Sequence, residues 1–361
     1  MLEARFRRGL SLAAIAAMLV VAACATPEPE PEPAPPPPPP AVTLNEGVAE
    51  AASIYVAFMR EAATIEAGFS SAESIQAAIR KGASYEPAQL SRGLIAYGSI
   101  LALQSPEFVA GVRTFAVDPT IRQEMVARII ADPAYAATLP GADAAAGLIV
   151  DAIGRDAATM LTIADAVEED AYTIQGRSDP RRRWATVPVA DRDVRLQGAK
   201  ALSAVQMLPS AEDSARLFAA AHAGSGLTVE PSRAGAPYTP AVVRSLALAA
   251  LAALGAGGDD ARANTEALAV EQNSEFCFNM SKLMLFQCLA ASRPSYEDIF
   301  CVGRHVARDL ATCTSQNIKT APVAVDPTTV ADSTPEPIQT PVAADAAAAS
   351  AAATAGLNGE G

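Results

Sequence analysis

Four cysteines near the end of the chain restrict its fold more than any other sequence feature. They follow one another at intervals of 11, 13 and 12 residues: Cys277, Cys288, Cys301 and Cys313. The surrounding residues predict a helix over 262–291 and a second over 295–314, joined by a turn at 292–294. Along a helix 11 residues cover about 16 Å, but the Cα atoms of a disulfide lie no more than about 7 Å apart. A disulfide here must therefore join one helix to the other.

An antiparallel hairpin permits one pattern of cross-links. Nested pairs bring Cys288 to Cys301 near the turn and Cys277 to Cys313 further out. Each expected contact face carries a helical stripe: Cys277, Met280, Met284 and Cys288 on one arm, and Val302, Val306, Leu310 and Cys313 on the other. We expect structural disulfides and no metal, because zinc ligands usually lie two to four residues apart. A zinc site with His305 one turn after Cys301 is the alternative.

Helical signals also fill the chain before the cysteines. A capping side chain precedes proline at the first helical position four times: Ser105-Pro106, Asp118-Pro119, Asp132-Pro133 and Thr239-Pro240. Apolar stripes follow, such as Ile121, Met125 and Ile129, and residues 142–175 are expected to form one long helix. Alanine, the best helix former, accounts for 82 of the 361 residues. The sequence predicts an all-α, multi-helix domain that ends in a disulfide-stapled antiparallel helical hairpin.

The composition changes along the chain and indicates its organisation. We divide it into four parts: a signal segment at 1–23, a Pro/Glu-rich tether at 24–44, the helical domain at 45–316 and a disordered tail at 317–361. Within the domain, residues 82–88 and 235–241 agree at five of seven positions, and each opens a predicted helix. This repeat would give two helical halves, 45–177 and 188–316. Chance agreement is the alternative, because alanine and glycine are abundant.

The start of the chain carries an export signal. Residues 1–8 are basic, residues 9–23 form an uninterrupted apolar run, and Cys24 follows directly. The end of the run, Val21-Ala22-Ala23-Cys24, resembles the lipobox of bacterial lipoproteins. The resemblance implies diacylglycerol on Cys24, cleavage before it and acylation of the new terminus, which together anchor a protein to a membrane. With Ala25 next, we expect the periplasmic face of the outer membrane rather than the inner membrane; an uncleaved transmembrane anchor is the alternative.

The charge balance argues against nucleic acid as a partner and makes a basic cluster at 181–184 stand apart from its acidic surroundings. The chain has 27 Lys and Arg against 40 Asp and Glu, a formal charge of −13. We expect no nucleic-acid binding, which needs a basic face. Within the helical domain, the basic cluster of Arg181, Arg182, Arg183 and Trp184 is a candidate for contact with anionic lipid headgroups. The alternative is pairing with a nearby acidic group: Asp165, Glu168, Glu169 and Asp170.

Catalytic side chains are scarce. The chain has two histidines, His222 and His305. Ser225 follows His222 closely but lacks the Gly-x-Ser-x-Gly pattern of a nucleophile elbow. We therefore expect no enzyme activity and no cofactor, and a lipid-anchored interaction or scaffold module that binds an envelope protein. A binding module for a small apolar or lipid-like ligand between helices is the alternative, and a serine hydrolase is a remote one.

Overall fold

The computed structural model describes residues 38–177 and 179–318. Within these ranges the protein is all-α, as predicted: it has no strand, and its extended pairings are isolated bridges at Leu44–Gly257 and Pro188–Pro294. The described residues from Ala41 onward belong to one compact unit. The α-helices are α2 (Glu46–Ala62), α3 (Ala72–Ala83), α4 (Pro87–Leu103), α5 (Pro106–Arg113), α6 (Pro119–Ala131), α7 (Ala142–Gly176), α8 (Arg192–Ser203), α9 (Ala211–Ala223), α10 (Pro240–Ala253), α11 (Arg262–Leu268), α12 (Gln272–Ala291), α13 (Ser295–Val302) and α14 (Asp309–Ile318).

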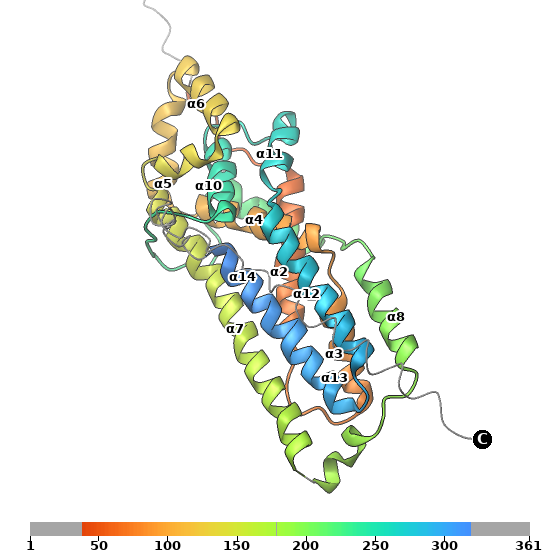
Figure 1. Ribbon diagram of the computed structural model, residues 1–361. Helices are drawn as coiled ribbons and strands as arrows, with labels where there is room; N and C mark the ends of the chain where they lie inside the picture. Colours follow the sequence, from red (N-terminus) through yellow and green to blue (C-terminus); the bar gives the residue numbers. More distant parts are fainter. Residues whose placement is uncertain (1–37, 178, 319–361) are drawn as a thin grey trace, which may run out of the picture. The chain divides into compact units, whose positions relative to one another are not determined.

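The core is built around α4 (Figure 1), which packs against α2, α7, α10 and α12. Gly93 lets α2 approach closely, because a Cβ at this position would lie 2.6 Å from the Ala51 carbonyl oxygen. On α10, Ser245 donates a hydrogen bond to the Ile95 carbonyl at 3.0 Å, and most of the helix is buried. Small side chains therefore set the spacing of these central helices.

The proline signals mark helix starts. Three of the four capping residues begin α-helices by accepting hydrogen bonds from backbone N–H groups: Ser105, Asp118 and Thr239. Asp132 caps a 3-10 helix, η3 (Pro133–Thr138), in place of an α-helix. Pro140 limits the length of this helix, because the residue before a proline is disfavoured in helical backbone. The capping chemistry thus located every start, but not the length or type of the helix that followed.

The predicted apolar stripes are buried on α7 and partly buried on α6. α7 runs over Ala142–Gly176, close to the predicted 142–175. Of the residues predicted to face inward, all but one are buried, and Ile163 is partly buried: Ile149, Ile153, Met160, Ile163, Val167 and Ile174. On α6, Met125 and Ile129 are buried, but Ile121 is 44% exposed, contrary to prediction. α6 packs mainly against α10, η3 and the short η2 (Thr114–Ala116). These neighbours do not cover its first turn.

The hairpin arms differ from the predicted helices at their far ends. The predicted helix over 262–291 is two helices, because the Glu271 carboxylate caps α12 by accepting hydrogen bonds from two N–H groups at 3.2 and 2.6 Å. The second arm continues through a π-helix, η6 (Gly303–Arg308), and ends at Ile318. The turn and the central part of both arms lie where the sequence predicts them.

Two nested disulfides join the arms. Cys277 is bonded to Cys313 with Cα atoms 5.6 Å apart, and Cys288 to Cys301 with Cα atoms 5.7 Å apart. Figure 1 shows α12 alongside α13 and α14, which in turn lie against α7. The disulfide-stapled antiparallel hairpin is confirmed.

Of the two predicted contact faces of the hairpin, the one on the second arm is buried and the one on α12 is partly exposed. Val302, Val306 and Leu310 are buried, but Met280 and Met284 on α12 are 37% and 38% exposed. α12 turns another set of side chains inward: Ser274, Phe278, Ser281, Lys282, Leu285 and Leu289. Because α12 carries apolar side chains on two faces and packs through one, the other remains outside.

The domain extends slightly beyond the predicted limits of 45 and 316. The Thr43 N–H donates to the Ala252 carbonyl at 3.0 Å and Leu44 is buried, so the last residues assigned to the tether belong to the domain. At the other end α14 reaches Ile318. The repeat segments at 82–88 and 235–241 lead into α4 and α10, which pack against each other. Both suggested halves therefore contribute to one core.

Substituting Gly93 tests the close approach of α4 and α2. Gly93→Ala should lower the free energy of unfolding by about 1–3 kcal/mol, because the new Cβ meets backbone that cannot yield easily. Gly198→Ala on α8 is the matched control, since no atom lies within 4 Å of the new Cβ there. Urea denaturation should show the control unchanged or stabilised by up to about 1 kcal/mol. Equal effects at both positions would contradict the packing described.

Reduction tests the hairpin. Opening both disulfides should lower the free energy of unfolding by several kcal/mol, because the loops that they close, of sequence separation 36 and 13, gain freedom in the unfolded chain. The measurement is urea denaturation with and without reductant, with peptide mapping of the oxidised protein. Recovery of a Cys277–Cys288 peptide would show that α12 is not continuous.

Candidate functional site

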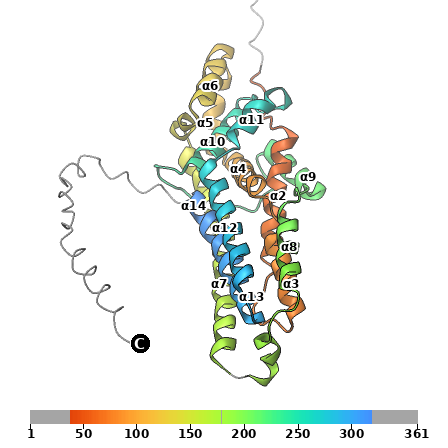
Figure 2. The ribbon, with the colours of Figure 1, turned by 45° about the vertical axis from the view of Figure 1, so that its right-hand side comes forward.

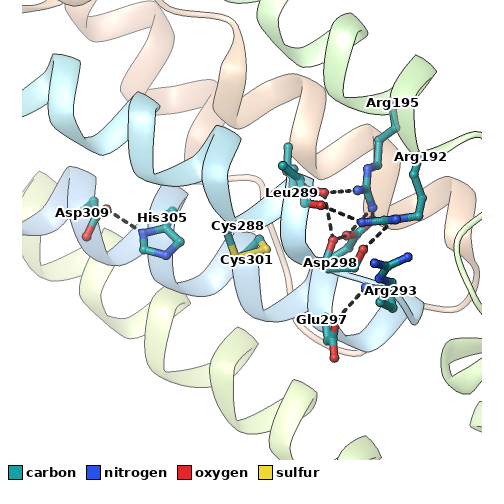
Figure 3. Close-up of a disulfide and its surroundings, with 12 residues drawn as sticks. Arg192, Arg195, Cys288, Leu289, Arg293, Glu297, Asp298, Cys301, His305 and Asp309 are labelled. Atoms are coloured by element: carbon teal, nitrogen blue, oxygen red, sulfur yellow. Dashed lines mark hydrogen bonds and ion pairs between the residues drawn. A yellow bond between two sulfur atoms is a disulfide. The ribbon is translucent and has the colours of Figure 1, made fainter. Parts of the chain in front are cut away.

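Two arginines of α8 hold the turn of the hairpin (Figure 3). Arg192 donates to the carbonyls of Ser292 and Ala290 at 2.7 and 2.6 Å. Arg195 donates to the Leu289 carbonyl. It also donates to both carboxylate oxygens of Asp298, each at 2.5 Å. These bonds satisfy carbonyls at the end of α12, which have no partners within their own helix.

Asp298 is the buried centre of this arrangement. Asp298 is fully buried (0% exposed). Its carboxylate also accepts hydrogen bonds from Ser292 at 2.6 Å and from Gln76 of α3 at 3.3 Å. Burial raises the pKa of the Asp298 carboxyl, while Ser292 and Arg195 act in the opposite direction. A buried charge is tolerated when it is paired and hydrogen-bonded, and here the donors come from α3, α8 and the turn. Asp298 therefore joins three elements distant in sequence.

A cleft lies between α3 and α8, beside this buried pair. Its volume is about 790 Å³, within the range of small-molecule sites. The segment before α8 is held to the hairpin turn, since the Val189 N–H donates to the Arg293 carbonyl at 2.7 Å. Most of the lining is apolar, and includes Ile79, Trp184, Val187, Val194, Ala199 and Leu202. The cleft is open to solvent, so it has the composition of a ligand site without its enclosure.

The structure separates the members of the basic cluster. Arg182 forms an ion pair with Asp170 at 2.8 Å, and Trp184 is half-buried and lines the cleft. Arg181 and Arg183 are exposed. Both lie in a 3-10 helix, η4 (Pro180–Thr186), which follows α7. Arg182 is therefore engaged within the protein, and headgroup contact by Arg181, Arg182, Arg183 and Trp184 stays a prediction.

The acidic group near the end of α7 is paired. Arg308 of η6 donates to Glu168 at 2.6 Å and to Asp165 at 2.7 Å. Asp170 pairs with Arg182, as stated, and the Glu169 carboxylate accepts from Thr173 at 3.4 Å. Among the described residues no group of three or more His, Cys, Asp or Glu side chains could hold a metal ion. Asp165, Glu168 and Asp170 therefore bind α7 to neighbouring elements.

Both histidines have structural partners. His222 contacts the Phe218 carbonyl through Nδ1 at 2.8 Å and accepts from the Leu44 N–H through Nε2 at 3.4 Å. With both nitrogens occupied, His222 is not placed to act as a base for Ser225. His305 pairs with Asp309 at 3.1 Å, and its sequence neighbour Cys301 is in a disulfide. The zinc alternative therefore loses its thiolate ligand.

The outward face of α12 is apolar and uncharged. Phe276 and Leu283 are 65% and 46% exposed, and Met280 and Met284 lie between and beside them. None of the exposed positions of this helix, all of them described, carries a charge: Gln272, Asn273, Phe276, Asn279, Met280, Leu283, Met284, Gln287, Ala290 and Ala291. We call Phe276, Met280, Leu283 and Met284 the α12 face. Figures 1 and 2 show α12 with no other described helix in front of it.

The two charged residues of α12 are turned away from this face. Lys282 is buried and donates to the carbonyls of Ala83, at 2.9 Å, and Tyr85. Burial lowers the pKa of Lys282 to about 7. Glu275 is partly buried and lies 3.9 Å from Arg92 of α4. Charge on α12 is therefore used for internal packing, and the outside is left neutral.

Comparisons with known proteins yield no relative. The chain matches no family model, no curated protein and no solved structure. The class of protein must therefore be inferred from the residues described above.

The predicted anchor lies outside the described residues. Cys24, the signal segment and the tail after Ile318 are not among them. None of the described helices is long and apolar enough to cross a membrane. Lipidation of Cys24 stays a prediction from the lipobox.

Sequence reasoning missed Arg195, Asp298 and the α12 face. Asp298 precedes Val302 by four residues, so it falls on the stripe predicted to be buried. An acidic side chain in such a stripe requires a cationic partner, and that signal was available, although it does not identify Arg195. The second apolar stripe on α12 was also readable from its spacing.

Removing Arg195 tests the buried pair. Arg195→Met should lower the free energy of unfolding by about 3–5 kcal/mol, because Asp298 is left buried without its cation. The double variant with Asp298→Asn should recover part of this loss. Arg192→Met, which breaks only hydrogen bonds to carbonyls, should cost about 1 kcal/mol. Urea denaturation measures all three, and a loss below that of Arg192→Met would show that the pair does not stabilise the turn.

Proposed function

We propose that this chain is a lipid-anchored, non-enzymatic interaction module of the bacterial cell envelope, facing the periplasm from the outer membrane. The lipobox-like Val21-Ala22-Ala23-Cys24 supports this cellular location, and an even number of cysteines besides Cys24 suits an oxidising compartment. The partner is a protein, with membrane contact through the lipid.

One observation carries the interaction role, namely the α12 face. Protein interfaces are depleted in charge at their centre and enriched in aromatic residues and methionine, and Phe276, Met280 and Met284 fit that description. Exposed apolar side chains scattered singly need no explanation, whereas a contiguous group marks an interaction site. The engagement of His222 and His305 with structural partners supports a non-enzymatic role.

The anchor is tested by lipid labelling. Cys24→Ser should leave an unprocessed or mislocalised precursor, because thioether formation precedes cleavage. Metabolic labelling with an alkynyl fatty acid should mark the wild type and not the variant. Equal labelling of both proteins would contradict the anchor.

The α12 face is tested by photo-cross-linking in intact cells. A photoreactive residue at position 280 should give adducts larger than the monomer. Leu283→Glu should remove them, because a charge is placed in an apolar contact. Leu161→Glu on α7 is the matched control, since Leu161 is 43% exposed against 46% for Leu283. Adducts that survive Leu283→Glu would show that partners bind elsewhere.

The cleft between α3 and α8 supports a second candidate, the binding of a small apolar or lipid-like ligand. Gly198 lines the cleft, and a side chain there meets no protein atom within 4 Å of its Cβ. Gly198→Leu should therefore fill the cleft and reduce binding of an apolar fluorescent dye at least tenfold. Gly176→Leu, equally free of neighbours but outside the cleft, is the control. Equal dye binding by both variants would remove this candidate.

A further inference from the structure

We infer that the partner of the α12 face is a second copy of this chain, bound helix to helix about a two-fold axis. The inference rests on the proposed function and names its partner. Three properties of α12 carry it: the spacing of its exposed positions, their lack of charge, and the fit of the helix to itself when reversed.

The exposed positions of α12 repeat at intervals of three and four residues. All six positions of this seam are exposed: Asn273, Phe276, Met280, Leu283, Gln287 and Ala290. Alternating intervals of three and four place side chains along one line, so that each can enter the gap between side chains of a second helix. The seam runs almost the whole 20-residue helix, about 30 Å. Its partner is therefore another helix of similar length.

The lack of charge on the seam is compatible with a copy of this chain as the partner. The chain has a formal charge of −13, so two copies repel wherever acidic side chains meet. α7, for comparison, exposes Arg155, Asp165 and Glu169. The seam on α12 exposes no charge, so two copies can meet there without like charges in contact. A strongly basic partner, by contrast, would find no carboxylate on the seam to bind.

The seam complements itself when the two helices run antiparallel. With the axis between positions 280 and 283, Met280 packs against the partner's Leu283, and Phe276 against the partner's Gln287. Asn273 then lies against the partner's Ala290. In the two outer pairs, Phe276 with Gln287 and Asn273 with Ala290, a larger side chain meets a smaller one. Every contact occurs twice, as two-fold symmetry requires.

The fold prepares α12 for this contact. Two disulfides and Lys282 fix the inner side of the helix, and Arg192 and Arg195 hold its end. Little order is therefore lost from the backbone on association, which favours binding. Lipid on Cys24 would add to this by confining copies to one membrane and raising their effective concentration.

Native mass spectrometry of the mature chain, extracted from membranes in detergent, tests the partner. The wild type should be a dimer, Leu283→Glu should raise the dissociation constant at least tenfold, and Leu161→Glu should leave it unchanged. Circular dichroism checks that each variant is folded. A monomeric wild type, or a dimer insensitive to Leu283→Glu, would overturn the inference.

Charge exchange tests the antiparallel register. Met280→Lys and Leu283→Glu should each weaken the homodimer, because each buries two unpaired charges. Mixing the two variants should give a heterodimer. In one of its two central contacts the new lysine faces the new glutamate, and in the other Met280 still packs against Leu283. Absence of a heterodimer would overturn the register.

The cross-linking experiment separates the two proposals. Adducts at position 280 that contain only this chain support both. Adducts that contain a different protein leave the interaction role standing and overturn the second copy as partner. Absence of adducts overturns both.

Discussion

The maximum length that a disulfide can bridge determines how the last helices of this structure, α12, α13 and α14, pack. Because cysteines on one helix are too far apart to bond to each other, the four cysteines tie α12 to α13 and α14 at two levels. The Arg195–Asp298 pair then fixes α8 to the turn of the same hairpin. With its inner side held in this way, α12 cannot rotate to bury its second apolar stripe. The outward position of Phe276 and Leu283 follows from that restraint.

Much of this fold was readable from the sequence, because the signals involved are local or geometric. Capped prolines located helix starts, and helical spacing of apolar residues defined α7. The disulfide pairing followed from helix rise, bond reach and the antiparallel turn, without knowledge of the neighbouring helices. These features share a property: each depends on residues close in sequence or on a distance that the backbone fixes.

The remainder depends on which helices meet, and no local pattern states that. The division between α11 and α12 arises from the carboxylate of Glu271, which acts as a less common cap than Ser or Asp. The partner of Asp298 is Arg195, more than a hundred residues earlier, on a helix that buries little besides Arg195 and Ala199. Met280 and Met284 lie on the same helix as two bridged cysteines, yet they face outward because α12 contacts α4 and α8 as well as α14.

The central claim is that the α12 face points outward and that only a second copy of the chain covers it. Methionine oxidation tests this claim most directly. Met280 and Met284 are 37% and 38% exposed, whereas Met160 is fully buried. In dilute protein, hydrogen peroxide should oxidise Met280 and Met284 much faster than Met160, and their oxidation should slow as the concentration rises. If Met280 and Met284 react as slowly as Met160 at every concentration, the chain itself covers this face and the account is wrong.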